Sequence, residues 1–401
     1  MSGKPKLWTK DFLIVSGANF FLYFTFYLLM ATITLFATDR FHASPSVAGL
    51  ASGIFVVGIL IARLFAGRSI DKVGRKKMLY IGFAAIVAIT LLYFFIQNLA
   101  VLLVVRFLNG AALGIASTAT GTIVANLIPK ERRGEGTGYY ALSVTLAAAV
   151  GPFIGMFLIE HASFNVIFVL CLVLLALSFV AALFLNVPKV VLSKAELDKM
   201  KGLKLSNFFE PKVFPIAIIS AFVGLGYSSI LSFLTSYASE MNLVDISSFF
   251  FIVYAITVLV SRPFTGRWFD TKGENFVMYP SFILFAIGLL LLNQANSGLF
   301  ILLAGVFVGL GYGTYSSSGQ AIAIKVAPDH RIGLATSTFF IFLDAGVGVG
   351  PFLLGLFVPI AGYHGLYAIM AAVMLICTFL YYFLYGKKAV AARNMVQQQA
   401  E

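Results

Sequence analysis

Twelve long apolar runs alternate with short polar connections along this chain of 401 residues. Each run holds the roughly 20 residues that an α-helix needs to cross the hydrocarbon core of a bilayer. The runs cover residues 12–37, 46–66, 78–97, 99–127, 136–160, 164–186, 212–238, 247–267, 276–295, 298–326, 333–360 and 364–386. The pattern predicts an all-α integral membrane protein. Its first run is too long for the core of a cleaved signal peptide, so we expect it to remain as a spanning helix.

The two halves of the chain share a repeated pattern at an offset of 199 positions. The first cluster, Arg63, Gly67, Arg68, Asp71 and Gly74, recurs as Arg262, Gly266, Arg267, Asp270 and Gly273, and the second, Pro129, Arg132, Gly134, Thr137, Gly151 and Pro152, recurs as Pro328, Arg331, Gly333, Thr336, Gly350 and Pro351. One spacing serves both clusters, so the chain contains a duplicated block of six helices. Two six-helix bundles related by a parallel internal repeat are the plan of one class of secondary transporter.

Composition and charge agree with a membrane protein. Hydrophobic residues make up 60% of the chain and charged residues only 11%, and the net charge is +12. A basic balance can favour nucleic acid, but 24 Lys and Arg lie at the termini and in the even-numbered connections, against Arg40 alone in the odd-numbered ones. This bias predicts a multi-pass protein of the cell (plasma) membrane with both termini cytoplasmic. Lipid is then an expected partner and nucleic acid is not.

The connection between spans six and seven departs from the pattern. We expect a bundle over residues 1–186, a cytoplasmic linker over 187–211, a second bundle over 212–386 and a cytoplasmic tail over 387–401. Within the linker, Ser193 and Glu196 have the spacing of a capping box and predict a short helix on the membrane surface. Its basic residues favour a tether attracted to anionic lipid, with a regulatory site as the alternative.

The connection after the second span reads GRSIDKVGRKK over residues 67–77, and a degenerate copy follows the eighth span. This strongly resembles the signature cytoplasmic loop of the major facilitator superfamily, and the resemblance covers the whole chain. It implies a twelve-helix transporter similar to the drug/metabolite:proton antiporter branch. The signature loop implies a gating role for Gly67, Arg68, Asp71, Gly74, Arg75, Gly266, Arg267, Asp270 and Gly273. Glycines permit close approach and tight turns, and the aspartate can lie at a helix N-terminus or pair with arginine. Positive-inside topology alone explains the basic residues but not the Gly–Asp–Gly spacing.

Arg106 lies in the fourth span, roughly 10 Å from its outer end. A charge near the bilayer centre costs about 2.5–3.5 kcal/mol on insertion scales, so it should face protein or water. The family's fourth helix has an Arg followed by Gly in this pattern, here with Asn109, Gly110 and Gly114, and the resemblance implies proton coupling. The alternative is a structural tie to backbone carbonyls, or a side chain that snorkels outward.

Two helices carry a Gly-Pro kink motif that resembles the motif of the family's antiporters. Its residues are Gly151, Pro152 and Gly155 in span five, and Gly350 and Pro351 in span eleven. Ala147 and Met156 stand where the family pattern has glycines. The motif favours export over uptake, and the alternative is a packing kink without directional meaning.

Asp344 lies deep in span eleven, about 20 Å from Arg331, and its repeat counterpart is Thr145. A low dielectric disfavours the charged form of a carboxylate, so we expect Asp344 to load and release a proton. It could instead bind a cationic group of the substrate or pair with a basic residue. Glu135, in a first helical turn, is more consistent with a structural role.

Polar residues at helical spacing mark candidate positions of a substrate cavity on spans one, four, seven and ten, which surround the central site in the family. They are Asn19, Tyr23, Tyr27, Asn109, Ser228, Ser232, Tyr312, Tyr315 and Gln320. The alternative is hydrogen bonding between helices. Abundant Phe and Tyr weakly favour amphipathic compounds as the small-molecule substrate.

Many proton-coupled multidrug antiporters of the family carry an acidic residue within span one, and this chain departs from them there too. Its acids nearest to the middle of span one are Asp11 and Asp39 at the ends of the span, and Asn19 cannot titrate. There is no GxxxxGK[ST] loop, which argues against ATP. The four His show no catalytic spacing, so an enzyme is not expected. Cys171 and Cys377 lie in apolar runs, and no metal site or cofactor is expected. We therefore expect a proton-coupled exporter of small organic molecules. Uptake by a symporter or facilitator is the alternative, and a membrane sensor or enzyme is a remote one.

Overall fold

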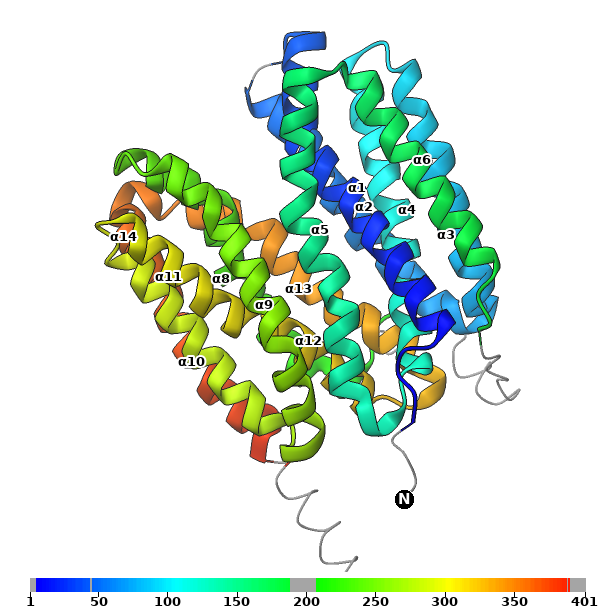
Figure 1. The fold of residues 1–401 in the computed structure, drawn as a ribbon, viewed down its shortest axis with the longest axis vertical. Helices are drawn as coiled ribbons and strands as arrows, with labels where there is room; N and C mark the ends of the chain where they lie inside the picture. Colours follow the sequence, from blue (N-terminus) through cyan, green and yellow to red (C-terminus); the bar gives the residue numbers. More distant parts are fainter. Residues whose placement is uncertain (1–4, 44, 188–206, 388, 390–401) are drawn as a thin grey trace, which may run out of the picture. The chain divides into compact units, whose positions relative to one another are not determined.

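The computed structural model describes residues 5–43, 45–187, 207–387 and 389, and all regular structure among them is helical. The long helices are α1 (Lys10–Phe41), α2 (Pro45–Val73), α3 (Arg75–Leu91), α4 (Leu99–Leu127), α5 (Arg133–His161), α6 (Phe164–Leu183), α8 (Phe214–Glu240), α9 (Val244–Lys272), α10 (Glu274–Asn293), α11 (Gly298–Val308), α12 (Thr314–Val326), α13 (Ile332–Gly355) and α14 (Val358–Tyr381). Their course is shown in Figure 1. The surface helix expected around Ser193 lies outside the described residues.

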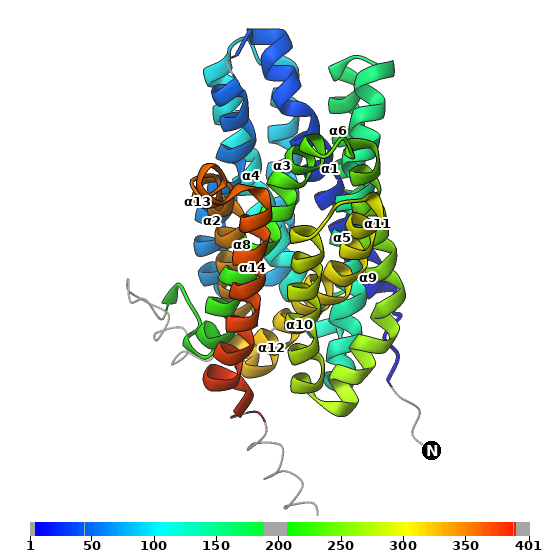
Figure 2. The same cartoon turned by 90° about the vertical axis from the view of Figure 1, so that its left-hand side faces the viewer.

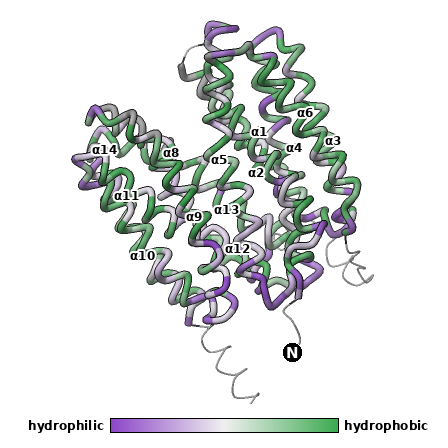
Figure 3. The backbone as a smooth tube through the Cα atoms, in the orientation of Figure 1, coloured by the Kyte–Doolittle hydropathy of each residue, from purple (hydrophilic) through white to green (hydrophobic). Residues whose placement is uncertain are grey.

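Twelve spans in the described part of the chain are long and apolar enough to cross a membrane, which confirms the predicted number. A π-helical segment, η5 (Gly309–Gly313), joins α11 and α12 into one span, Gly298–Val326. Hydrophobic residues line the helices, and hydrophilic residues concentrate near their ends (Figure 3). Large apolar side chains such as Phe153 and Leu177 are exposed on the helix surfaces. Such a surface is stable when lipid is the solvent around the helices.

Local chemistry explains where several helices begin and end. The Thr9 hydroxyl accepts a hydrogen bond from the Phe12 N–H at 3.2 Å and caps α1, and the Asn98 side chain accepts one from the Val101 N–H at 2.9 Å and caps α4. The break between α2 and α3 falls at Gly74, with φ +95°, and the break between α9 and α10 falls at Gly273, with φ +90°. Only glycine adopts this backbone readily, which explains the repeated glycine at both turns.

The described residues form two compact units. The first comprises residues 1–129, 143–210 and 328–338, and the second comprises residues 130–142, 211–327 and 339–401. Each unit therefore contains a short segment from the opposite half of the sequence, at the start of α13 and of α5 respectively. The predicted division into two sequence halves with a linker stays a prediction.

Close helix contacts hold each unit together. In the first, a Cβ at Gly110 of α4 would overlap the Phe55 carbonyl of α2, and buried Ile33, Phe168 and Cys171 belong to the core around α1, α4 and α6. In the second, a Cβ at Gly346 of α13 would overlap the Ala221 carbonyl of α8. Figure 2 shows α10 beside α14 in this second unit, and residues of the two helices are in contact.

Candidate functional site

Asp344 lies near the middle of α13, about 18 Å from its start and about 17 Å from its end. Its side chain is half-buried. Gly346 and Gly350 bring this part of α13 against α8, since Cβ atoms at these positions would overlap Ala221 and Ser228. The acid therefore lies on a closely packed helix of the second unit, far from both helix ends. Its function as a proton carrier stays a prediction.

Arg106 of α4 is fully buried in the first unit. Its Nε donates to the Ala51 carbonyl at 2.9 Å, its Nη1 donates to the Tyr93 hydroxyl at 3.4 Å, and the guanidinium carbon lies 4.4 Å from the centre of the Phe55 ring. Nη2 has no hydrogen-bond partner among the described residues. This environment matches a structural tie, and a role in proton coupling stays a prediction.

Two further arginines are buried inside spans, and neither was among the residues predicted for the site. Arg63 of α2 donates to the Tyr23 hydroxyl at 3.1 Å and to Ser117 at 3.3 Å. Arg262 of α9 donates to the Ser317 hydroxyl and, at 2.8 Å, to the Gly313 carbonyl. Both residues are 2% exposed. The signal that could have found them was present, because these arginines are repeat partners inside apolar runs, three residues from the end of 46–66 and five residues from the end of 247–267.

An aromatic group lies beside Arg262 in the second unit. Tyr312 belongs to the π-helical segment, and its ring stacks on Tyr227 of α8 with centroids 3.8 Å apart and planes within 5°. The Tyr254 ring of α9 lies 6.0 Å from Tyr227. The Phe285 ring of α10 lies 5.8 Å from Tyr312. π-Helical segments are frequent at functional sites, and this one supplies the Gly313 carbonyl that accepts from Arg262, with Tyr312 as the preceding residue.

The polar residues proposed for a cavity take part in several separate contacts. In the first unit, the Asn19 side chain donates to Ser143 at 2.8 Å and accepts from Thr120 at 2.9 Å, while Asn109 donates to Thr90 of α3 at 3.3 Å. Tyr23 contacts Arg63, and Tyr27 lies 6.5 Å from the Tyr23 ring.

In the second unit the proposed cavity residues differ in exposure. Tyr315 is buried and its hydroxyl lies 2.9 Å from that of Ser220, and buried Ser228 donates to the Leu225 carbonyl at 2.7 Å. Ser232 is exposed, and Gln320 is 2% exposed. Hydrogen bonds between helices account for several of these positions, and cavity lining stays a prediction for the set.

The first copy of the signature loop attaches α2 to the start of α13. Asp71 and Arg75 form a buried ion pair at 2.9 Å, and Arg75 also donates to the Asp329 carbonyl at 3.0 Å. The Ser337 hydroxyl donates to the Arg63 carbonyl at 2.6 Å. A Cβ at Gly67 would overlap Ser337, so glycine is required for this approach.

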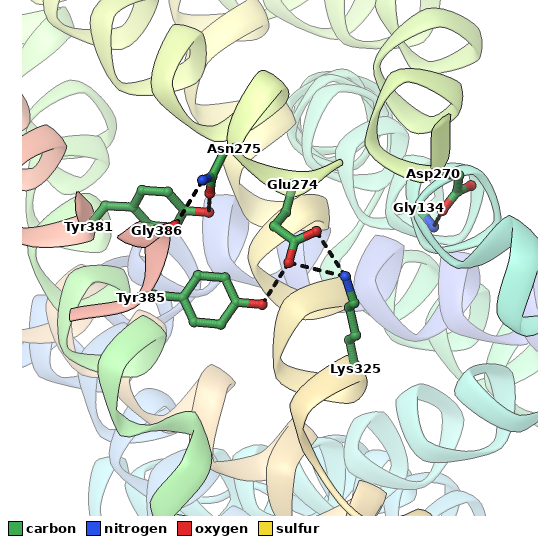
Figure 4. Close-up of polar contacts among 8 residues, drawn as sticks. All are labelled: Gly134, Asp270, Glu274, Asn275, Lys325, Tyr381, Tyr385 and Gly386. Carbon is green, nitrogen blue, oxygen red and sulfur yellow. Dashed lines mark hydrogen bonds and ion pairs between the residues drawn. The ribbon is translucent and has the colours of Figure 1, made fainter. Parts of the chain in front are cut away.

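The second copy uses its aspartate differently, as Figure 4 shows. Asp270 accepts hydrogen bonds from the Gly134 N–H at 2.7 Å and the Glu135 N–H at 3.0 Å, and so caps the start of α5. Glu135 pairs with Arg132 at 2.8 Å and lies 4.0 Å from Arg267. The two partners expected for the signature aspartate, an arginine and a helix N-terminus, thus occur in one copy each.

The position that is Arg75 in the first copy is Glu274 in the second. Glu274 pairs with Lys325 at 2.9 Å and accepts a hydrogen bond from the Tyr385 hydroxyl at 3.0 Å (Figure 4). The adjacent Asn275 accepts from the Tyr381 hydroxyl at 2.8 Å. These contacts connect the start of α10 to the ends of α12 and α14.

The residues of the kink motif lie inside α5 and α13. Cβ atoms at Gly151 and Gly155 would lie 2.9 Å from Tyr27 and from Thr32 of α1, and one at Gly350 would overlap Ser228 of α8. The glycines thus allow close packing within each unit. The meaning of the motif for transport direction stays a prediction.

The chain is similar to known transporters along most of its length. The profile described as Major Facilitator Superfamily matches residues 15–279 and 244–399. Multidrug resistance protein 1 of Bacillus subtilis (strain 168) is 26% identical over 84% of this chain and 87% of its own. The multi-drug resistance efflux pump PmrA of Streptococcus pneumoniae is 26% identical over 93% of this chain and 95% of its own.

A solved structure of a Major Facilitator Superfamily transporter, FucP, in the outward conformation superposes with a TM-score of 0.76 at 17% identity, covering 94% of this chain and 99% of that one. At this identity the likeness concerns the fold. Together the matches confirm the resemblance noted in the sequence, the all-α twelve-span fold and a transporter rather than an enzyme.

Proposed function

Because the chain belongs to the Major Facilitator Superfamily, and is therefore a multi-pass transporter of small molecules in the plasma membrane, we propose that it exports small organic molecules in exchange for protons. Two relatives named for multidrug resistance support export. The observation that carries the proton role is the place of Asp344, which lies farther from the ends of its span than the other acids of the described spans.

Asp344 would couple the two fluxes through its charge. Facing outside, the carboxylate takes a proton and the substrate leaves; facing the cytoplasm, it loses the proton and regains the negative charge that attracts a cationic substrate group. Proton and substrate then compete for one residue, which is the requirement for exchange. The two six-helix bundles would alternate in access by rocking about a site near the membrane midplane.

The signature loops would control the cytoplasmic side of this cycle. Asp270 caps the start of α5, and Asp71 pairs with Arg75, which donates to the Asp329 carbonyl just before α13. We propose that these contacts form and break during transport. In this arrangement both termini lie in the cytoplasm, in line with the charge bias of the connections.

The test uses everted membrane vesicles with an acidified lumen and a pH-sensitive dye. We expect a compound from a panel of amphipathic cations, zwitterions, sugars and metabolites to trigger proton efflux. Asp344→Asn should abolish the signal because asparagine cannot titrate, although the protein still inserts. Asp39→Asn, which removes an exposed carboxylate at the end of α1, is the matched control.

Normal proton efflux in Asp344→Asn would show that the proton role is assigned to the wrong residue. Further acidification of the lumen when a compound is added would contradict exchange. That result would favour the alternative, a symporter for uptake.

A further inference from the structure

Arg262 is a buried charge that the proposed proton cycle does not use. It lies in the middle of the span Phe249–Lys272 and is 2% exposed. Its guanidinium donates to the Ser317 hydroxyl and the Gly313 carbonyl, and no acidic side chain of the described residues forms an ion pair with it. Charges inside membrane segments pair with one another or with backbone carbonyls, or face water, and the Nε of Arg262 has no hydrogen-bond partner among the described residues, so an anion from outside the chain fits the position.

The neighbouring face of span ten presents further unused polar groups. Arg262 Nε, Gln320 Nε2 and Thr314 Oγ1 are buried and have no hydrogen-bond partner among the described residues. Thr314, Ser317 and Gln320 are spaced by three along α12, so they lie on one side of the helix. The first two of the unused atoms can only donate, and a hydroxyl can also donate. A set of unused donors next to a guanidinium is complementary to the oxygens of a carboxylate.

The aromatic neighbours define the other part of the ligand. Tyr312 precedes Gly313, whose carbonyl accepts from Arg262, and its ring stacks on Tyr227 at 3.8 Å, with the Tyr254 ring 6.0 Å from Tyr227. Flat apolar surface next to a cationic group suits a molecule that combines a ring with an anionic group. The first unit does not reproduce this chemistry, because the repeat counterparts of Thr314 and Gln320 are Ile115 and Gly121, which carry no polar side-chain atom.

We propose that Arg262 and Gln320 bind an anionic group of the transported molecule. This inference rests on the proposed function in two respects: the bound molecule is a substrate, and its cationic group binds at Asp344. Since Asp344 in the same unit attracts a cationic group, the substrate class is an amphipathic zwitterion with an aromatic or other flat apolar part. The negative group bound by Arg262 stays charged through the cycle, while the positive group competes with the proton at Asp344. An anionic group therefore does not conflict with proton exchange.

The start of α5, which the Asp270 cap holds, packs against Arg262. A Cβ at Gly138 of α5 would lie 3.4 Å from Arg262 Cδ, and this part of α5 is held by the Asp270 cap at 2.7 and 3.0 Å. Release of the cap would expose the guanidinium on the cytoplasmic side. Substrate would thus reach Arg262 from the side that an exporter loads.

Binding is tested on the full-length protein in detergent by thermal unfolding. The probes are 4-(aminomethyl)benzoate, benzoate and benzylamine, which share a ring and differ in charge. A ligand that binds the folded state raises the unfolding midpoint according to its concentration and affinity. We expect both carboxylates to raise the midpoint of the wild type, and their affinity to fall at least about tenfold in Arg262→Gln, since a charge-assisted contact is lost. The shift with benzylamine should not change in this variant.

Two further variants guard against a folding defect. Gln320→Met keeps the volume and leaves Arg262 in place, and it should also weaken both carboxylates but not benzylamine. Arg40→Gln, at the exposed end of α1, is the control and should bind like the wild type. Equal carboxylate affinity in the wild type and Arg262→Gln, or no carboxylate-dependent shift in the wild type, would overturn the assignment. The assay uses no proton gradient, so failure of proton-coupled export in vesicles would leave a positive binding result intact, and the reverse also holds.

Discussion

Arg106 and Arg262 are both buried guanidinium groups, yet their surroundings differ. Arg106 has a backbone carbonyl, a phenol and an aromatic face around it, which are permanent parts of the first unit. Arg262 also has a backbone carbonyl and a hydroxyl as partners, but Thr314 Oγ1 and Gln320 Nε2 on the helix that supplies this hydroxyl are buried without a hydrogen-bond partner in the described part of the chain. At the scale of the residue, the first environment stabilises a structure and the second is suited to a ligand.

This difference makes Arg106→Lys a test of structure. Lysine keeps the charge but cannot donate to both Ala51 and Tyr93 while it stacks over Phe55. We expect the variant to lose about 1–3 kcal/mol of stability, measured by unfolding in detergent, because buried hydrogen-bond acceptors lose their donor. Arg40→Lys, an exposed exchange, is the control. An unchanged midpoint in Arg106→Lys would show that these contacts contribute little to the fold.

At the scale of the element, the starts of α5 and α13 are the parts that the signature loops hold. The cap on α5 depends on one carboxylate that accepts two backbone N–H bonds, next to the positive end of a helix dipole. The Gly266 backbone lies against Glu135, since a Cβ there would be 2.6 Å from its Cα. The segment that the cap holds is the short start of α5, so loss of the cap should be measurable as greater accessibility of this part of the helix.

We therefore expect Asp270→Asn to loosen the start of α5. Thr137, 1% exposed in α5, is changed to cysteine as a reporter, and native Cys171 and Cys377 are buried and give a low background. Labelling of Thr137→Cys by N-ethylmaleimide should become faster with Asp270→Asn, by up to about fivefold, since the amide keeps one acceptor oxygen for the two N–H groups and complete loss of a cap costs about 1 kcal/mol. Asp39→Asn in the same background should have no effect. Equal labelling rates would contradict a latch at this helix start.

The elements also show what could be read from the sequence. The spans could be predicted because lipid imposes a simple apolar pattern, and α1 exceeds the predicted range 12–37 only by a few residues at each end. The π-helix at Gly309–Gly313 and the partners of Arg63 and Arg262 could not, because they depend on contacts between segments far apart in the chain. Asp71 and Asp270 could be recognised from the sequence as counterparts in the internal repeat. Their different partners could not be predicted, because the sequences around the two residues are alike.

At the scale of the whole molecule, the proposed cytoplasmic gate depends on which side of the membrane the connections face. The charge bias predicts that the connection after α2 is cytoplasmic and the end of α1 is external. Lys77→Cys and Arg40→Cys place one exposed thiol at each, over a background of buried native cysteines. A membrane-impermeant maleimide added to intact cells should label Arg40→Cys, and it should label Lys77→Cys only after permeabilisation. The reverse pattern would place the signature loops outside and would contradict their proposed role as a gate on the cytoplasmic side.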